Sequence, residues 1–189
     1  MRAGTVDSME TTAADLLAPR VRERAPACGT TRVIAIDGRS GSGKTSLALD
    51  LADRLGAPIL HLERIYPGWH GLAETPAIVR ALLADLAIGE LGRAPQWDWE
   101  ADRPGSPLTL RPTAELIIEG VGSGARALRP FLSHLTWLDA PASVRRERAL
   151  ARDGATYEPW WDTWARQEES YLAAEWPQQA ADVVISTAP

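Results

Sequence analysis

Short apolar runs alternate along this chain with longer amphipathic stretches, a pattern typical of a parallel sheet covered by helices. Residues 33–36 and 116–118 are continuous apolar runs that predict buried strands, and the longer stretches repeat apolar residues every three or four positions. The predicted strands are residues 32–36, 58–62, 116–118, 135–138 and 182–186. The predicted helices are residues 12–24, 43–55, 75–88, 142–152 and 159–174. We therefore expect an α/β fold with a five-stranded parallel sheet and helices on both faces.

The length of 189 residues suits one domain with a full core. We expect residues 1–29 to be an N-terminal extension with a helix and residues 30–189 to form the main domain. Residues 89–112 break the alternation of strands and helices with four prolines and two tryptophans. This segment is interpreted as an insertion at the C-terminal edge of the sheet, where open α/β sheets bind ligands.

A glycine-rich loop at residues 38–45, Gly-Arg-Ser-Gly-Ser-Gly-Lys-Thr, fits the phosphate-binding pattern G-x-x-x-x-G-K-[ST] at every fixed position. It lies between a predicted strand and a predicted helix, so its backbone N–H groups and the helix N-terminus can cradle phosphate oxygens. Lys44 supplies a cation for the β- and γ-phosphates, and Thr45 supplies a hydroxyl ligand for Mg²⁺. The residues expected to bind ATP here are Gly38, Arg39, Ser40, Gly41, Ser42, Gly43, Lys44, Thr45 and Ser46.

Composition narrows the possible partners. The net charge of −5 argues against a general binder of nucleic acid or of a membrane surface, because both require a basic face. No apolar run approaches the roughly 18 residues of a membrane helix. Cys28 is the only cysteine, which excludes an intrachain disulfide and fits a cytoplasmic location. Lys44 is the only lysine, so its place inside the motif strengthens the functional interpretation.

Four segments together resemble the uridine kinase-like branch of the P-loop kinases, which also contains relatives of phosphoribulokinase and pantothenate kinase. They are residues 37–45, 60–69, 117–120 and 145–153. The resemblance covers about residues 30–186. It implies a three-layer P-loop NTPase fold, ATP and Mg²⁺ as cofactors, and an arginine-bearing lid at about residues 145–158.

The resemblance also implies a catalytic base at the end of the second strand. The matching position is Glu63, followed by Tyr66 at the family spacing. The family typically has Asp there, so this chain carries a carboxylate that is one methylene longer. Its location next to the phosphate loop suits a base that orients and deprotonates an acceptor hydroxyl. The alternative is an exposed acid paired with Arg64.

Glu119 ends the apolar run 116–118 and matches the second acidic strand end of the family, where it would hold Mg²⁺ together with Thr45. The alternative is an ordinary acid at a strand end. Arg145, Arg148 and Arg152 are spaced to share one helix face. The resemblance makes Arg148 and Arg152 the lid arginines that neutralise phosphate charge, and the alternative is a solvated basic face.

The chain has eight tryptophans and one phenylalanine, and several of the tryptophans lie near the end of the site where the acceptor is expected to bind. Each on its own is explained by packing, but as a group they suggest an aromatic wall for the acceptor. The residues expected to bind the acceptor are Glu63, Tyr66, Trp69, Trp97, Asp98, Trp161 and Trp164. Asp98 is among them because the resemblance implies an acid in the matching insertion that contacts hydroxyl groups of the acceptor. Trp99 and Trp160 lie in the same two segments.

These features predict an ATP-dependent kinase that phosphorylates a hydroxyl of a small molecule, most readily a nucleoside or a nucleoside-like compound. Lys44, Glu63, Arg148 and Arg152 are its expected catalytic residues. A sugar, a vitamin precursor or an antibiotic hydroxyl is an alternative acceptor. A nucleotide-binding regulator or an ATPase without an acceptor is an alternative of another class. The oligomeric state, monomer or homodimer, is left open.

Overall fold

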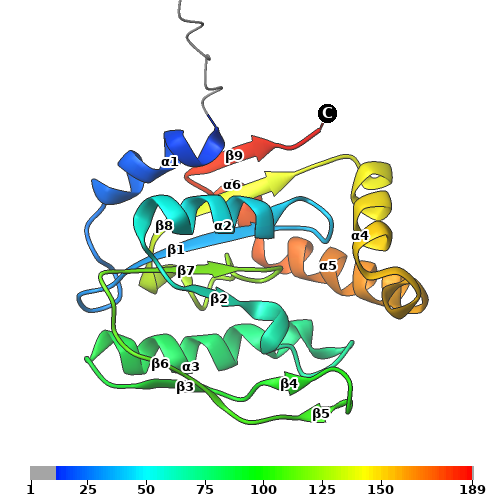
Figure 1. Ribbon diagram of the computed structural model, residues 1–189, viewed down its shortest axis with the longest axis horizontal. Coiled ribbons are helices and arrows are strands. Elements are labelled where there is room, and N and C mark those ends of the chain that lie inside the picture. The colour runs from blue at the N-terminus through cyan, green and yellow to red at the C-terminus, as the bar shows by residue number, and fades with distance from the viewer. Residues whose placement is uncertain (1–11, 189) are drawn as a thin grey trace, which may run out of the picture.

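The computed structural model describes residues 12–188, and a five-stranded sheet forms its centre (Figure 1). All four strand pairings in this sheet are parallel, and the strand order is β2-β7-β1-β8-β9. The strands are β1 (Arg32–Gly38), β2 (Ile59–His61), β7 (Glu115–Glu119), β8 (Leu132–Asp139) and β9 (Val183–Ser186). The α/β class and the five parallel strands expected from the sequence are confirmed.

Helices cover both faces of the sheet (Figure 1). They are α1 (Ala13–Arg22), α2 (Lys44–Leu55), α3 (Thr75–Ala87), α4 (Ala142–Tyr157), α5 (Trp161–Glu175) and α6 (Pro177–Ala180). Short 3-10 turns are η1 (Leu62–Arg64), η2 (Gly71–Ala73), η3 (Arg129–Phe131) and η4 (Glu158–Trp160). Helix α4 continues beyond the predicted end at residue 152, through a kink at Gly154, whose φ of 53° and ψ of −135° are not helical.

Side chains of β1 alternate between two apolar clusters, as the pleat of a strand requires. Ile34 and Ile36 are fully buried in the cluster that contains the apolar faces of α1 and α2. Val33 and Ala35 are fully buried in the other cluster, which contains residues of α3 and α5. This two-sided burial explains why the central strand is a continuous apolar run.

Residues 92–110 form two small antiparallel sheets rather than an irregular segment. Strand β3 (Gly92–Ala94) pairs with β6 (Leu108–Leu110), and β4 (Trp97–Asp98) pairs with β5 (Arg103–Pro104). Two or three residues are too few to show a period of two, so the sequence pattern did not predict these strands. Strand β3 packs on α3, and a Cβ at Gly92 would lie 2.9 Å from the carbonyl oxygen of Leu82.

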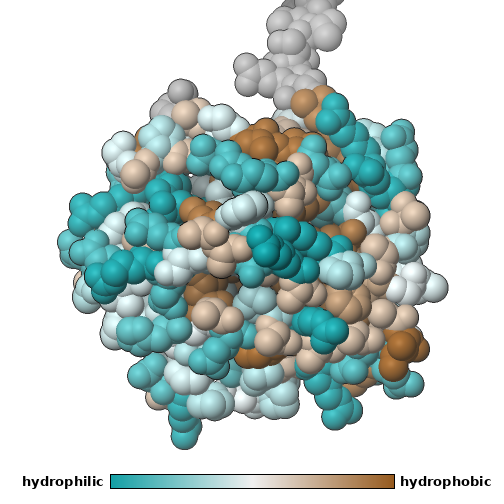
Figure 2. Space-filling view, turned by 180° about the vertical axis from the view of Figure 1, so that it is seen from behind, coloured by the Kyte–Doolittle hydropathy of each residue, from teal (hydrophilic) through white to brown (hydrophobic). Residues whose placement is uncertain are grey.

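The surface is mixed in polarity. Figure 2 shows hydrophilic side chains interspersed with smaller apolar areas on the face opposite to that of Figure 1. Within residues 12–188, none of the helices has both the length and the apolarity needed to cross a bilayer.

Candidate active site

The glycine-rich loop joins the C-terminal end of β1 to the first residue of α2, Lys44. Gly41 has a φ of 78°, and a Cβ there would lie 2.1 Å from the carbonyl oxygen of Arg145. A side chain at position 41 is therefore excluded by both conformation and space. The loop places the N-terminus of α2, with its unpaired N–H groups, at the edge of the sheet where a phosphate can bind.

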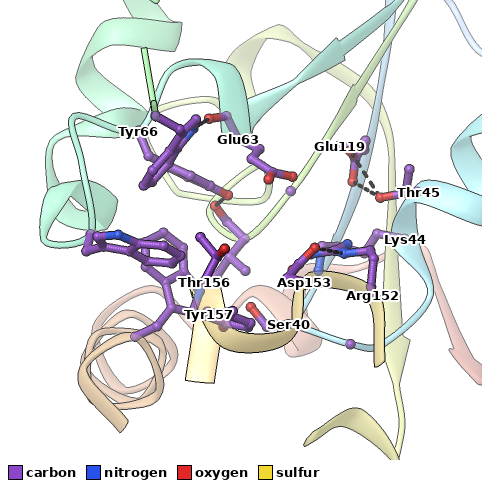
Figure 3. Close-up of a pocket in the computed structure, with 16 residues that line it drawn as sticks. Ser40, Lys44, Thr45, Glu63, Tyr66, Glu119, Arg152, Asp153, Thr156 and Tyr157 are labelled. Carbon is purple, nitrogen blue, oxygen red and sulfur yellow. Dashed lines mark hydrogen bonds and ion pairs between the residues drawn. The ribbon is translucent and has the colours of Figure 1, made fainter. Parts of the chain in front are cut away.

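A cavity of about 450 Å³ opens beside this loop (Figure 3). Three segments supply most of its polar lining: the glycine-rich loop, the turn after β2, and the end of α4. Its lining residues are Ser40, Gly41, Lys44, Thr45, Glu63, Tyr66, Trp69, Trp99, Glu119, Gly120, Val121, Arg152, Asp153, Thr156, Tyr157 and Trp164. The cavity thus contains candidate groups for a phosphate, a metal and an acceptor within one space.

Lys44, Thr45 and Glu119 form the inner end of the cavity. The ammonium of Lys44 donates to the carbonyl oxygen of Arg39 at 3.0 Å, and burial lowers the pKa of Lys44 while the Glu119 carboxylate acts against that shift. The hydroxyl of Thr45 lies 3.4 Å from both carboxylate oxygens of Glu119, which is almost fully buried. The register places Glu119 beside Ile36, two residues before the loop begins.

The donor set at this end suits Mg²⁺. A hydroxyl and a carboxylate are hard oxygen donors, and their separation is close to the about 3 Å between neighbouring ligands of an octahedral Mg²⁺ ion. Within the described residues, no group of three or more His, Cys, Asp or Glu side chains could hold a metal by itself. One or two protein oxygens are what Mg²⁺ uses when it is bound together with a nucleotide.

Glu119 has a further partner in His61 of β2. The imidazole Nδ1 lies 2.6 Å from Oε1 of Glu119, and this hydrogen bond raises the pKa of His61. The sequence alone gives His61 no role, because its contact with Glu119 depends on the pairing of β2 with β7.

Glu63 lies in η1, directly after β2, with its side chain exposed to the cavity (Figure 3). The guanidinium of Arg64 donates to the side-chain oxygen of Gln96 at 3.0 Å. Tyr66 is buried and its hydroxyl donates to the carbonyl oxygen of Val121 at 2.9 Å. The turn that carries Glu63 is thereby fixed against the strand end that carries Glu119.

Aromatic rings form the other wall of the cavity. Trp69 stacks on Tyr157 with 5.5 Å between the ring centroids and 12° between the planes, and it contacts Trp99 at 4.8 Å. The indole of Trp99 also donates to the carbonyl oxygen of Glu63 at 2.9 Å. Trp99, Thr156 and Tyr157 were not assigned from the sequence, because no local pattern shows which rings of a tryptophan-rich chain meet.

Three of the residues predicted to contact the acceptor do not line this cavity. The ring of Trp97 packs over Gly68, where an added Cβ would meet it at 3.3 Å. The carboxylate of Asp98 accepts a hydrogen bond from the N–H of Ala101 at 3.0 Å and so stabilises the turn between β4 and β5. Trp161 packs edge-on against Tyr157 at 5.6 Å. The aromatic wall therefore consists of Tyr66, Trp69, Trp99, Tyr157 and Trp164.

The three arginines of α4 that were expected to share one helix face, Arg145, Arg148 and Arg152, reach different places instead. Arg145 is buried and donates to the carbonyl oxygens of Ala140 and Ser40. Arg152 lines the cavity and makes two hydrogen bonds to the carboxylate of Asp153, at 2.8 and 2.6 Å. Arg148 does not line it, because its guanidinium contacts Thr187 after the last strand.

Arg148 and Thr187 instead line a second cavity, of about 340 Å³, with Gly43 and Ser46. The glycine-rich loop thus lies between two cavities, and six of the nine loop residues predicted to bind ATP line one or the other. Ser40, Gly41, Lys44 and Thr45 face the larger one. Gly38, Arg39 and Ser42 line neither cavity; Arg39 pairs with Glu168 at 2.8 Å, and Ser42 is buried with its carbonyl oxygen bonded to Thr187.

The strand order, the glycine-rich loop between β1 and α2, and the acid at the end of β7 together define a P-loop kinase fold. Structures with this fold confirm the assignment. The chain superposes with a TM-score of 0.63 on a possible uridine kinase from Bacillus stearothermophilus, at 24% identity over 91% of this chain and 96% of that chain. It superposes with a TM-score of 0.64 on a protein assigned as a fructose transport system kinase from Silicibacter sp. TM1040, at 19% identity over 92% and 99% of the two chains.

Among curated proteins, the chain is similar to the cytidylate kinase of Pyrococcus furiosus. The two are 30% identical over 126 residues, which make up 67% of this chain and 60% of that kinase. The match therefore spans less than two thirds of the relative's length. No family model matches the chain. The resemblance to nucleoside kinase-like P-loop proteins is confirmed for the fold.

Proposed function

We propose that the protein is an ATP-dependent kinase that transfers the γ-phosphoryl group to a hydroxyl of a small molecule, with a nucleoside or nucleoside-like compound as the acceptor. One observation carries this proposal: Lys44, Glu63 and Arg152 line the same cavity beside the glycine-rich loop. Phosphoryl transfer needs charge neutralisation on one side and an oriented hydroxyl on the other, and this set supplies both.

In this proposal the loop amides and Lys44 bind the triphosphate, and Thr45 and Glu119 hold Mg²⁺. The metal, when bound, would neutralise charge on the phosphates. Glu63 accepts the proton of the acceptor hydroxyl, and Arg152 leaves the carboxylate of Asp153 to contact the transferring phosphoryl group. Arg148, at the second cavity, serves the nucleoside end of ATP.

The cavity lining favours an unphosphorylated acceptor. Cytidylate kinase acts on a nucleotide, whose phosphate dianion calls for cationic side chains, usually arginines. Among the described lining residues the cations are Lys44 and Arg152, both of which the proposal assigns to the transferred phosphoryl group. The acceptor side presents the carboxylate of Glu63 and the rings of Trp69 and Trp99, which suit a neutral ring that bears hydroxyl groups.

The test is a screen for acceptor-dependent ADP release with ATP and Mg²⁺. We expect a nucleoside to stimulate release and the corresponding nucleoside monophosphate to have little effect. If only a sugar or an antibiotic stimulates ADP release, the protein is still a kinase, but its acceptor belongs to that class instead. Binding of ATP without stimulation by any hydroxyl compound would favour an ATPase or a regulator instead.

A further inference from the structure

His61 contacts the acid at the candidate metal position but does not line the cavity. Strand β2 is an edge strand of the sheet, and its last residue, His61, is the register partner of Glu119, the last residue of β7. The contact therefore follows from the pairing of the two strands rather than from a chance side-chain conformation.

The contact is the shortest that the Glu119 carboxylate makes within the described residues. Nδ1 of His61 lies 2.6 Å from Oε1, whereas the hydroxyl of Thr45 is 3.4 Å from each oxygen. The Glu119 side chain is only 6% exposed, so its carboxylate needs a fixed donor. An ionised carboxylate only accepts hydrogen bonds, so the Nδ1 atom of His61 carries the hydrogen.

We infer that His61 is a positioning residue for Mg²⁺ bound with a nucleotide. It holds Oε1 of Glu119 and so fixes the orientation of the carboxylate. The second oxygen, which lies 3.4 Å from the hydroxyl of Thr45 and makes no hydrogen bond with His61, would then be available to the metal. Partners of this kind orient metal ligands, and their loss costs about 10-fold to 100-fold in metal affinity. This inference rests on the proposed function, because it requires the nucleotide site formed by the glycine-rich loop.

Three substitutions of His61 isolate the hydrogen bond. His61→Asn keeps an N–H group at about the place of Nδ1, and His61→Leu removes it with a side chain that suits a strand. His61→Gln is a second removal variant that stays polar, because its amide matches Nε2 rather than Nδ1. Because the side chain of His61 is 32% exposed at the sheet edge, we expect all three variants to fold.

The measurement is the affinity for a non-hydrolysable ATP analogue, by calorimetry on the full chain, with Mg²⁺ and with a chelator. The ratio of the two affinities reports metal binding through linkage and needs no acceptor. We expect His61→Leu and His61→Gln to reduce this ratio about tenfold or more. We expect His61→Asn to keep it within about threefold, and the affinity without metal to be the same in all variants.

The outcomes separate this inference from the proposed function. Failure of the wild-type protein to bind the analogue would overturn the proposed function. If the wild-type protein binds the analogue, and Mg²⁺ strengthens binding equally in the wild type, His61→Leu and His61→Gln, only the role of His61 would be overturned. Equal losses in His61→Asn and His61→Leu would also overturn it, because the N–H group would then not be the cause.

Discussion

The carboxylate of Glu168 accepts a hydrogen bond of 2.7 Å from the backbone N–H of Ser40, which attaches helix α5 to the glycine-rich loop. The same carboxylate accepts from Nε of Arg39 at 2.8 Å, and Glu168 is almost fully buried. One turn further along α5, the hydroxyl of Tyr171 donates to the buried carboxylate of Asp37 at 2.5 Å. The conformation of the loop therefore depends on a helix about 130 residues away in sequence.

Replacement of the Glu168 carboxylate should destabilise the protein. Glu168→Gln removes the charge facing Arg39 and the buried Arg145 but keeps an oxygen acceptor. We expect the free energy of unfolding to fall by about 2–4 kcal/mol, because it leaves a largely buried cation without its partner. Urea unfolding measures this, with Glu169→Gln as the control, since that side chain is 68% exposed. Equal effects of the two substitutions would contradict the prediction.

Lys44→Met should abolish most phosphoryl transfer while the fold is kept. The methionine preserves much of the buried aliphatic stem and removes the ammonium that faces Glu119 and the cavity. Loss of one such electrostatic contact costs about 100-fold to 1,000-fold in kcat. ADP release in the presence of a stimulating acceptor checks this. Arg64→Met is the control, because Arg64 contacts Gln96 and does not line the cavity.

Glu63→Gln should lower kcat far more than it lowers the affinity for ATP. A base acts in the transition state, so its loss reduces kcat and kcat/KM together, by about 100-fold or more. Glu63→Asp should recover part of the rate, since it restores a carboxylate with a shorter reach. Glu100→Gln is the matched control, because Glu100 is an exposed acid that does not line the cavity. A normal kcat in Glu63→Gln would assign the role of the base to another group.

His134 should make the stability of the protein depend on pH. It is buried in β8, and burial lowers its pKa in the folded state, although the nearby Asp182 carboxylate acts against this shift and Arg20 and Arg24 add to it. A lowered pKa means that the folded state binds the proton less well than the unfolded state. The contribution of His134 is therefore present above its unfolded pKa of about 6.5 and is lost as the pH falls toward the folded value.

The measurement is the urea midpoint of the wild type and of His134→Gln between pH 7.5 and 5.5. We expect the urea midpoint of the wild type to fall as the pH is lowered, and the midpoint of His134→Gln to change less. Parallel curves for the two proteins would show that other groups cause the dependence.

The fold was predictable because its signals are local. A buried apolar strand, the glycine-rich loop and an amphipathic helix follow one another within residues 32–55, and each has its own pattern. Helix α2 ends at the predicted residue, Leu55, and Gly56 follows it as the C-cap with a φ of 67°. The extension of α4 beyond residue 152 was not predictable, because Gly154 interrupts the helix without ending it.

The site was predictable where a strand end determines it and not where packing does. Glu63 and Glu119 follow directly from the ends of β2 and β7. Trp99 reaches the site through its contact with Glu63, at a sequence separation of 36, and Glu168 through its contact with Ser40, at a separation of 128. No sequence spacing encodes such contacts. Trp97 was assigned because it lies in a segment near the expected acceptor end, and Asp98 because the family resemblance implies an acid in the matching insertion. Strand β4 and the turn after it direct both side chains elsewhere.

Trp69 lines the cavity and Trp97 does not, so substitutions of these two residues can test where the acceptor binds. Trp69→Leu and Trp97→Leu remove the same number of atoms from partly buried rings, but only Trp69 lines the cavity. Loss of a stacking surface for the acceptor should raise its KM in Trp69→Leu by about 10-fold, which corresponds to the 0.5–1.5 kcal/mol of an aromatic contact together with some lost apolar burial. Trp97→Leu should leave the KM within about twofold, and both should keep the wild-type affinity for the ATP analogue. Steady-state kinetics with varied acceptor measures the two values. A larger effect of Trp97→Leu would mean that the acceptor binds over β4 rather than against the aromatic wall.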